Sequence, residues 1–471
     1  KEPEKEQGAI SAPVGADGAA RAVAELNIEP GATLALPLDW RTWGLRLYRL
    51  LVQLPTRSGG LFQQPPAHEE LLQYLQEGLR LAEEMNQHET LEGAALLTAK
   101  AFFWWSWGER RGERELLDAL RSAREAVRIT EGLDDPGGAS EALDALGNIQ
   151  AITNDLRGNL ESQTRRLHWA RRLDDPTELV DIYGEVCSAY TLVGEYATAA
   201  EHGQRALDLA EASEADPLRA RALRSLTLAF FEWDHWPETM RLGERLQTLI
   251  LGPTPLGDFM RWALLAWAIA LARTGEREAA DDVARRALGA AEGESEQFIE
   301  LFKARLALAR GAMKEARQRM LLAIECRSGR VVLPALLADL AELGARTGDR
   351  EMYDHFGAQA LELGWRSGAR KPLAQAFRAR GVVAVADARW DDALSDLETA
   401  LSRQRELGTT WEQARTRYAL AGLYQRRGAE GDADRARDEL GAALALFEGL
   451  GAVRDIARAR AALAGGDVRL P

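Results

Sequence analysis

The side chains most able to carry catalysis or bind a transition metal are few in this sequence. Two cysteines are present, Cys187 and Cys326. The six histidines are His68, His88, His168, His202, His235 and His355. The histidines lie too far apart for a local zinc motif such as HExxH, and no Cys–His nucleophile signature occurs. The sequence therefore predicts no metal site, and we interpret the cysteines as buried free thiols in a reducing compartment.

Motifs for nucleotide chemistry are missing as well. The sequence contains no GxxxxGK[ST] phosphate loop, no GxGxxG dinucleotide fingerprint and no GxSxG elbow. Pairs of carboxylates such as Asp134–Asp135 and Asp281–Asp282 are common, but helix caps and solvated helix faces explain them. The sequence thus predicts a non-enzymatic protein without a cofactor.

One aromatic run could support recognition. Residues 102–107 read Phe-Phe-Trp-Trp-Ser-Trp, and consecutive helical side chains are spread by about 100°. These rings therefore cannot all face one side. Two interpretations stay open, namely core filling and the anchoring of a partner through exposed tryptophan. Stacking on nucleic-acid bases needs nearby positive charge, and here the arginines after the run alternate with glutamates.

The element that must position any site is a repeat of about 40 residues. A turn residue anchors each copy, and alanines follow at five and twelve residues, as in Gly194, Ala199 and Ala206. The nine anchors are Gly108, Asn154, Gly194, Asp234, Gly275, Gly311, Gly348, Ala388 and Gly428. Gly, Asn and Asp tolerate positive φ, so the anchor ends one helix and turns the chain into the next. A fixed period of this size predicts stacked helix pairs.

A second signal closes each unit. The sequence Leu-Asp-Asp-Pro occurs at residues 133–136 and again at 173–176, and Ala-Asp-Pro follows at 215–217. Asp accepts hydrogen bonds from the first helical amides, and Pro fits the first helical position. We therefore expect an Asp-capped helix to start at each of these three places.

This pattern resembles the tetratricopeptide repeat (TPR) family over about residues 91–464. The matching residues are Tyr183 or Phe377, Cys187 or Gly381, Tyr190, Gly194, and Tyr196 or Trp390. Family repeats run near 34 residues, so the longer period resembles instead the long-helix variant of MalT-type and other large LuxR-type regulators and of bacterial class III adenylyl cyclases. The resemblance implies an all-α, right-handed superhelical solenoid of antiparallel helix pairs with about nine repeats.

The resemblance also implies which side chains face the concave groove, because the first helix of each pair lines it. Carried over position by position, they are Trp105, Asn148, Arg221, Arg224, Phe231, Trp262, Arg305, Arg378 and Arg415. Related domains use the amide of such an asparagine to hold a peptide main chain. Arginines gathered in the groove would suit an acidic or carboxylate-bearing ligand. The alternative is that each arginine lies on a solvated helix face.

Charge and composition set the surroundings. The formal net charge of −14 disfavours direct binding of nucleic acid, and no apolar stretch approaches the length of a membrane span. We expect residues 1–38 to be a linker, 39–90 a helical cap that opens the solenoid, 91–464 the solenoid with a last capping helix, and 465–471 a tail. Because the chain starts at Lys1, we interpret it as a fragment or a processed chain.

These observations predict a cytoplasmic scaffold or sensor domain of a bacterial signalling or transcription-regulating protein that binds a protein or peptide. The alternative is the autoinhibitory region of an ATPase or adenylyl cyclase whose catalytic domain lies outside this chain. A partner ATPase, cyclase or DNA-binding domain acting in cis would then also lie outside it.

Overall fold

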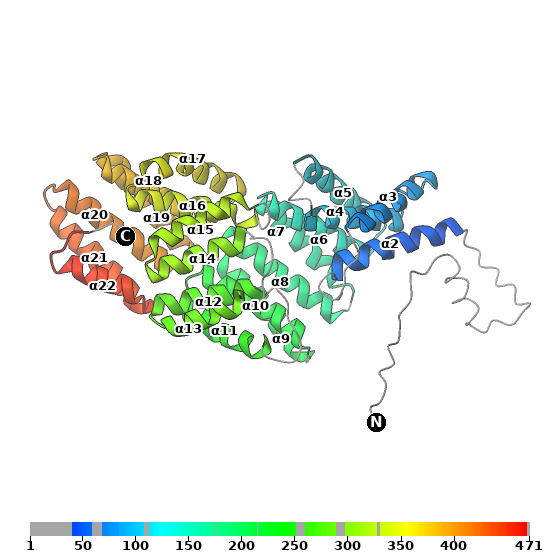
Figure 1. Ribbon diagram of the computed structural model, residues 1–471, viewed down its shortest axis with the longest axis horizontal. Coiled ribbons are helices and arrows are strands. Elements are labelled where there is room, and N and C mark those ends of the chain that lie inside the picture. The colour runs from blue at the N-terminus through cyan, green and yellow to red at the C-terminus, as the bar shows by residue number, and fades with distance from the viewer. Residues whose placement is uncertain are drawn as a thin grey trace, which may run out of the picture.

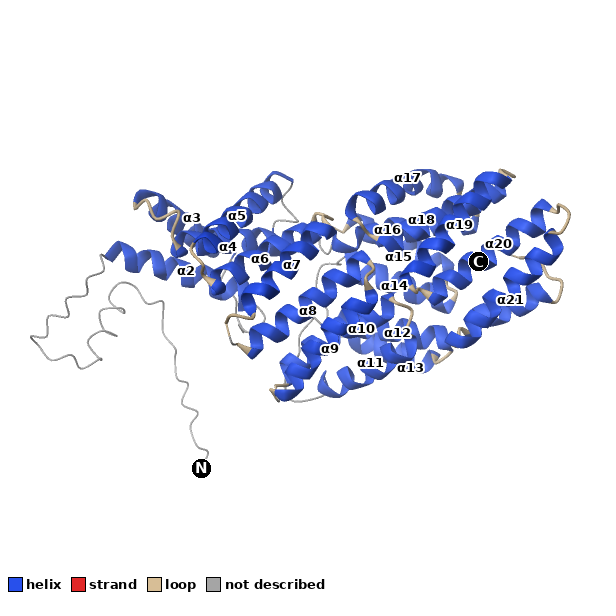
Figure 2. Ribbon diagram, turned by 180° about the vertical axis from the view of Figure 1, so that it is seen from behind, coloured by secondary structure: helices blue, strands red, loops and turns tan. Residues whose placement is uncertain are grey.

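The computed structural model describes residues 40–58, 68–107, 113–173, 175–213, 215–250, 260–288, 297–326 and 330–468. All regular secondary structure within these ranges is helical (Figure 2). The helices form a solenoid of antiparallel pairs with a period near 40 residues, which confirms the predicted fold class. The expected linker at 1–38 lies outside the described residues.

Two helices open the solenoid, α2 (Trp40–Ser58) and α3 (His68–Glu84). The described pairs, with the inner helix first, are α4 (Leu91–Trp107) and α5 (Glu113–Gly132), α6 (Pro136–Ile152) and α7 (Leu156–Ala170), α8 (Pro176–Val193) and α9 (Tyr196–Ala212), α10 (Asp216–Glu232) and α11 (Trp236–Ile250), α12 (Arg261–Thr274) and α13 (Arg277–Leu288), α14 (Gln297–Arg310) and α15 (Met313–Glu325), α16 (Leu333–Thr347) and α17 (Arg350–Ser367), α18 (Arg370–Ala386) and α19 (Trp390–Leu407), and α20 (Thr410–Arg427) and α21 (Asp432–Leu450). A short 3₁₀ turn, η4 (Arg330–Val332), precedes α16, and α22 (Val453–Leu463) ends the stack.

The turn residues behave as the repeat pattern predicts. All eight anchors within the described ranges have positive φ, from 56° at Ala388 to 97° at Gly275. Gly108, the remaining anchor, lies outside them. Positive φ costs a glycine nothing and an asparagine or aspartate little. The anchors therefore fix where each inner helix stops.

The helix starts match the prediction at two of the three places. Asp135 and Asp175 accept hydrogen bonds from first-turn amides of α6 and α8, and a proline stands at the first helical position in both. The expectation for Asp216 is wrong. Ala215 is the cap residue there, and the Asp216 side chain pairs with Arg219 at 2.9 Å instead. Because Asp216 already lies inside the helix, its carboxylate cannot reach back to the amides that a cap residue serves.

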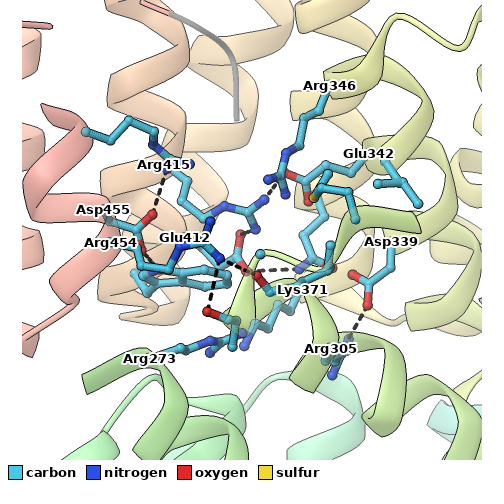
Figure 3. Close-up of a pocket in the computed structure, with 18 of the residues that line it drawn as sticks. Arg273, Arg305, Asp339, Glu342, Arg346, Lys371, Glu412, Arg415, Arg454 and Asp455 are labelled. Atoms are coloured by element: carbon cyan, nitrogen blue, oxygen red, sulfur yellow. Dashed lines mark hydrogen bonds and ion pairs between the residues drawn. The ribbon is translucent and has the colours of Figure 1, made fainter. Parts of the chain in front are cut away.

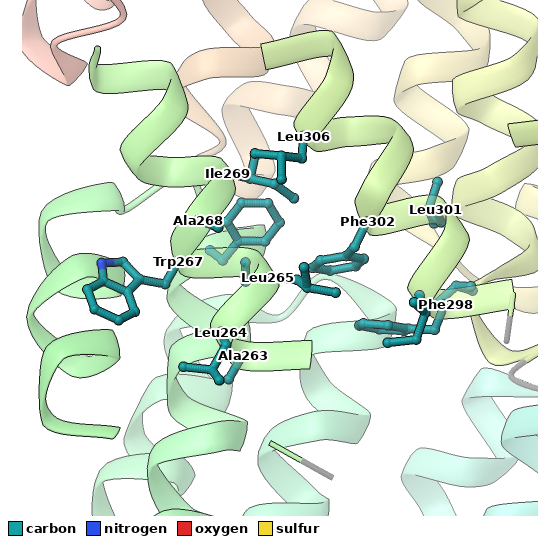
Figure 4. Packing of buried hydrophobic residues seen from close by; sticks show 14 of the residues in the cluster. Ala263, Leu264, Leu265, Trp267, Ala268, Ile269, Phe298, Leu301, Phe302 and Leu306 are labelled. Carbon is teal, nitrogen blue, oxygen red and sulfur yellow. The ribbon is translucent and has the colours of Figure 1, made fainter. Parts of the chain in front are cut away.

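The inner helices are buried nearly all round, whereas the outer helices bury one stripe. In α12 every residue from Ala263 to Ala272 is buried, while its partner α13 buries four residues, mostly alanines. The side chains of α12 and α14 interdigitate to form the largest apolar cluster of the described chain (Figure 4). Ala199 and Ala206 are fully buried, as the repeat pattern predicts. Small residues at these positions let the two helices of a pair approach closely.

The aromatic run contributes mainly to the core. Phe102 and Phe103 are buried in two neighbouring clusters, and Trp104 and Trp105 pack against them half-buried. The side chains of residues 106 and 107 lie outside the described ones. Of the cysteines, Cys187 is buried, which raises the pKa of its thiol to about 12, but Cys326 is only half-buried. The prediction of burial is therefore wrong for Cys326, which stands just after the end of α15.

The solenoid turns so tightly that its carboxy-terminal helices meet its middle. Helix α22 contacts α12, and α20 to α22 lie beside α12 to α14 (Figure 1). One side chain connects the end of α10 directly to α20. Oδ2 of Asp234, the anchor after α10, accepts the backbone N–H groups of Trp411 and Glu412 at 3.0 and 3.3 Å. These contacts cap α20 across 177 residues of sequence, and they enclose the inner face between α10 and α22.

Candidate ligand-binding cavity

The enclosed inner face contains a cavity of about 270 Å³. Its walls come from the inner helices α10, α12, α14, α16, α18 and α20, together with α22 (Figure 3). The basic side chains that line it are Arg273, Arg305, Arg346, Lys371, Arg415, Arg454 and Arg458. The acidic ones are Glu232, Asp339, Glu342, Glu412 and Asp455. Basic groups thus outnumber acidic ones in the lining of a strongly acidic protein.

One group of ions crosses from α16 to α20. Glu342 accepts two hydrogen bonds from Arg378, at 3.1 Å from Nε and 2.9 Å from Nη2, and it also pairs with Arg415. Glu412 pairs with Nη1 of Arg378 at 2.5 Å and with Arg415 at 3.5 Å. Burial alone would raise the pKa of Glu412, but Arg378, Arg415 and Lys371 together hold that pKa well below its usual value. Both carboxylates are therefore charged and fully engaged.

A second group lies between α10, α14, α16 and α18. Arg305 pairs with Glu232 at 3.0 Å and with Asp339 at 2.7 Å. Lys371 pairs with Glu232 at 3.2 Å and with Asp234 at 3.4 Å. Each cation of this group has two carboxylate partners, so this end of the cavity carries no excess of positive charge.

Two arginines differ from all the others in the lining. Arg273 and Arg346 have no ion pair and no hydrogen bond to any residue of the described chain. Arg273 lies against aromatic rings instead, 3.8 Å from the centroid of Trp411 and 5.1 Å from that of Trp236. Burial lowers the pKa of Arg273 to about 10. The cation–π contacts of Arg273 leave the hydrogen-bonding capacity of its guanidinium unused.

Arg346 lies beside further arginines. Burial lowers the pKa of Arg346 to about 9, and repulsion by Arg415 and Arg458 adds to the decrease. Its Nε atom is buried without a partner, and so is Nε of Arg458. Arg458 has one carboxylate partner, Asp455, at 2.6 Å. Figure 3 shows Arg346 and Arg415 extending toward each other from opposite walls. The guanidinium groups of Arg346 and Arg415 remain charged at neutral pH.

Helix α22 closes the cavity on one side. Arg454 donates to the carbonyl oxygens of Leu308 and Ala309, both at 3.3 Å. Trp411 Nε1 donates to Asp455 at 2.9 Å. These contacts connect the last helix to α14 and α20.

The structure brings some of the sequence-predicted residues together here. Phe231, Arg305 and Arg415 line the cavity, and Arg378 lies directly behind its wall. All three of these arginines pair with carboxylates of the protein itself, which differs from the expected row of free cationic groups. Their proposed contact with a ligand stays a prediction.

The other predicted residues lie elsewhere. Arg221 and Arg224 pair with Asp181 and Glu185 on α8, at 2.7 and 3.2 Å. Trp262 stacks on Phe298 with the ring centroids 4.1 Å apart. Asn148 donates to the backbone oxygen of Asp144 at 2.9 Å. Trp105 packs edge-on against Phe102. None of these residues lines the central cavity.

Sequence reasoning missed Arg273, Arg346 and Glu232 as lining residues. All three stand two positions before an anchor, namely before Gly275, Gly348 and Asp234. Ala309, two positions before Gly311, also lines the cavity. The last turns of the inner helices α10, α12, α14 and α16 thus face the cavity. A search at this offset from the anchors could have found these residues.

Within the described ranges no group of three or more His, Cys, Asp or Glu side chains is arranged to hold a metal ion. The same ranges contain no helix with the length and apolar character needed to span a membrane. The fold and the cavity together define a TPR-like helical solenoid with an enclosed, charged inner face.

Comparisons with known proteins add little to this description. The chain matches no model of a known protein family, and it matches no curated protein. Among solved structures it is similar to the apo form of RapI, with 14% identity over 78% of this chain and 91% of that chain and a TM-score of 0.48. A Rap protein complexed with competence and sporulation factor gives 11% identity, coverages of 90% and 96%, and a TM-score of 0.42. A chain of the APC/C hetero-tetramer Cut9–Hcn1 gives 15% identity over 90% of this chain and 97% of that chain, with a TM-score of 0.41. Similarities of this size do not extend to function.

Proposed function

We propose that this protein is a non-enzymatic binding scaffold that takes up an acidic group of a protein or peptide partner in the central cavity. The observation that supports the proposal most directly is that Arg273 and Arg346 line the cavity without an ion pair within the described chain, and that Nε of Arg346 is buried without a hydrogen-bond partner. A buried cation without a partner is costly. A carboxylate from outside would supply the hydrogen bonds that these two side chains lack.

The rest of the lining prepares the cavity for this role. Arg305, Lys371, Glu342 and Glu412 are fixed by ion pairs within the protein. A ligand would therefore meet side chains that already hold their places, which lowers the entropic cost of binding. Trp105, Asn148, Arg221 and Trp262 keep part of their surface exposed. In this proposal they contact the partner outside the cavity.

The setting of the proposal follows from the sequence. The long-helix repeats resemble those of MalT-type and LuxR-type regulators, so we place the scaffold in a bacterial signalling or transcription-regulating protein in the cytoplasm. Binding at the cavity would report to a partner domain through α22, which forms one wall.

The experiment is a selection from a display library of short peptides that end in a free carboxylate. We expect enrichment of peptides with acidic side chains or with a required free carboxyl terminus. The enrichment should disappear with the double variant Arg273→Gln, Arg346→Gln. It should persist with Arg285→Gln, since Arg285 lies on the outer helix α13 with a side-chain exposure of 72%. Selection of the same peptides by the double variant would refute the proposed site.

A further inference from the structure

The charge of the cavity is distributed unevenly along its length. At the end formed by Arg305 and Lys371, each of these two cations has two carboxylates within 3.4 Å. At the opposite end, Arg346, Arg415 and Arg458 come together from α16, α20 and α22. Glu342 is the carboxylate whose charge acts on Arg346, but it already pairs with Arg378 and Arg415. Arg415 pairs with Glu342 and Glu412, and Arg458 pairs with Asp455, so Arg346 is the cation of this second end that has no ion pair within the described chain.

From this juxtaposition we infer that the end of the cavity lined by Arg346, Arg415 and Arg458 is a binding site for one oxyanion group, a carboxylate or a phosphate, which ties α16 to α22. The inference rests on the proposed function for its choice of cavity, and it adds the anchoring group and the structural consequence of binding. Planar guanidinium forks match the oxygens of these two groups, and chloride offers no such match.

The consequence for the fold follows from the positions of Arg346 and Arg458 in the chain. Arg346 belongs to the last turn of α16, and Arg458 belongs to α22. Without an anion the two side chains repel each other. With an anion between them, α22 is held more firmly against the middle of the solenoid. Binding in the cavity would therefore slow the opening of α22, in addition to the hold that Arg454 provides on α14.

Two sources of the anion are compatible with this chemistry, a free small molecule and an acidic group of a peptide. The cavity, at about 270 Å³, is slightly smaller than most small-ligand sites, which start at roughly 300 Å³. The part of any ligand inside it is therefore small. The experiment has to separate the two sources.

The test measures the thermal midpoint of unfolding with inorganic phosphate, with N-acetylglutamate and with sodium chloride, all at one ionic strength. We expect phosphate or N-acetylglutamate to raise the midpoint of the wild type more than chloride does. In Arg346→Gln the apparent affinity should fall by about tenfold, because the charge-assisted hydrogen bonds are lost. Arg346→Gln should fold normally, since no carboxylate loses its partner. Arg285→Gln again serves as the control and should respond like the wild type.

Hydrogen exchange supplies the second readout. Amides of α22 should exchange more slowly in the wild type with the stabilising anion present, and Arg346→Gln should show no such change. Equal stabilisation of wild type and Arg346→Gln, or no stabilisation beyond that by chloride, would overturn the inference. If peptides are still selected through Arg273 and Arg346 in that case, the proposed function stands and only the free-anion site falls. If the anions bind but no peptide is selected, the oxyanion site stands and the ligand is a small molecule.

Discussion

Arg166 and Arg346 are both arginines in the interior of the solenoid, and their surroundings are opposite. The side chain of Arg166, on α7, is completely buried, and it contacts Asp144, Glu178 and Asp181 at 2.8, 3.0 and 2.7 Å. Arg346 contacts no carboxylate and faces a cavity. In the first case the carboxylates raise the pKa of the arginine even against burial, and in the second case burial and neighbouring arginines lower it.

The difference between these two arginines distinguishes a charge that stabilises the fold from one that is available to a ligand. Around Arg166 the fold itself supplies the hydrogen-bond acceptors for the guanidinium group. This arginine therefore has nothing left to offer a ligand. Around Arg346 the fold supplies no counterion, although acidic residues are abundant in this protein. A charge that the protein leaves unpaired at a cavity wall is the better guide to a binding site than a paired one.

The largest effect should come from Arg166→Leu. Removing the guanidinium would leave three carboxylates close together in a mostly buried setting, so we expect a loss of about 3–5 kcal/mol in the free energy of unfolding. Urea denaturation would measure it. The matched control is Arg172→Leu, which removes an exposed pair with Asp134 and should leave the midpoint nearly unchanged. A stable Arg166→Leu protein would mean that the paired network is not structural.

Glu412→Gln should show a pH-dependent loss. The pKa of Glu412 is lowered in the folded protein, so its charge stabilises the fold above the unfolded pKa of about 4.3. That contribution decreases as the pH falls below this value toward the folded pKa. We expect the variant to be less stable than the wild type by about 2–3 kcal/mol at pH 7.

The same comparison at lower pH is the decisive measurement. Urea denaturation of both proteins at pH 7, 4 and 3 should show the gap becoming smaller with each step. A gap that stays constant would indicate that the pKa of Glu412 is the same in the folded and the unfolded protein, and the network with Arg378 would need another explanation.

Asp234→Gly should have a smaller effect, about 1–2 kcal/mol, because the first turn of α20 loses a hydrogen-bond acceptor for two amides. Glycine tolerates the positive φ of 64° at this position, so the turn itself survives. Asn154→Gly is the matched control. It is also an anchor, with φ 61°, but its side-chain oxygen has no hydrogen-bond partner. Equal losses in both variants would mean that Asp234 acts only as a turn residue.

These two anchors also show how far the sequence can predict the structure. The repeat period located both turns correctly, because a turn depends on its own residue and its immediate neighbours. The contact between Asp234 and α20 depends on the accumulated rotation of several repeats. A small change of angle at each helix pair would separate the two partners, and no local pattern records that angle.

The candidate site was predictable to a similar extent. The repeat frame pointed to Phe231, Arg305 and Arg415, which line the cavity. It gave no sign that Arg221 and Arg224 would pair with Asp181 and Glu185 on the preceding inner helix. A sequence places arginines on a helix face, but only the packing of neighbouring repeats decides which of them meet a carboxylate.

The smallest effect, and the one most informative for the comparison, is expected for Arg346→Leu. This substitution is chemically identical to Arg166→Leu, yet it removes a cation that has no partner and that Arg415 and Arg458 repel. In a buffer without phosphate or carboxylates, we expect the free energy of unfolding to stay the same or to rise by up to about 1 kcal/mol. Urea denaturation of the two variants beside the wild type would measure both effects under one set of conditions. If Arg346→Leu lost as much stability as Arg166→Leu, Arg346 would be a structural arginine too. The unpaired charge at the cavity wall would then no longer mark a binding site.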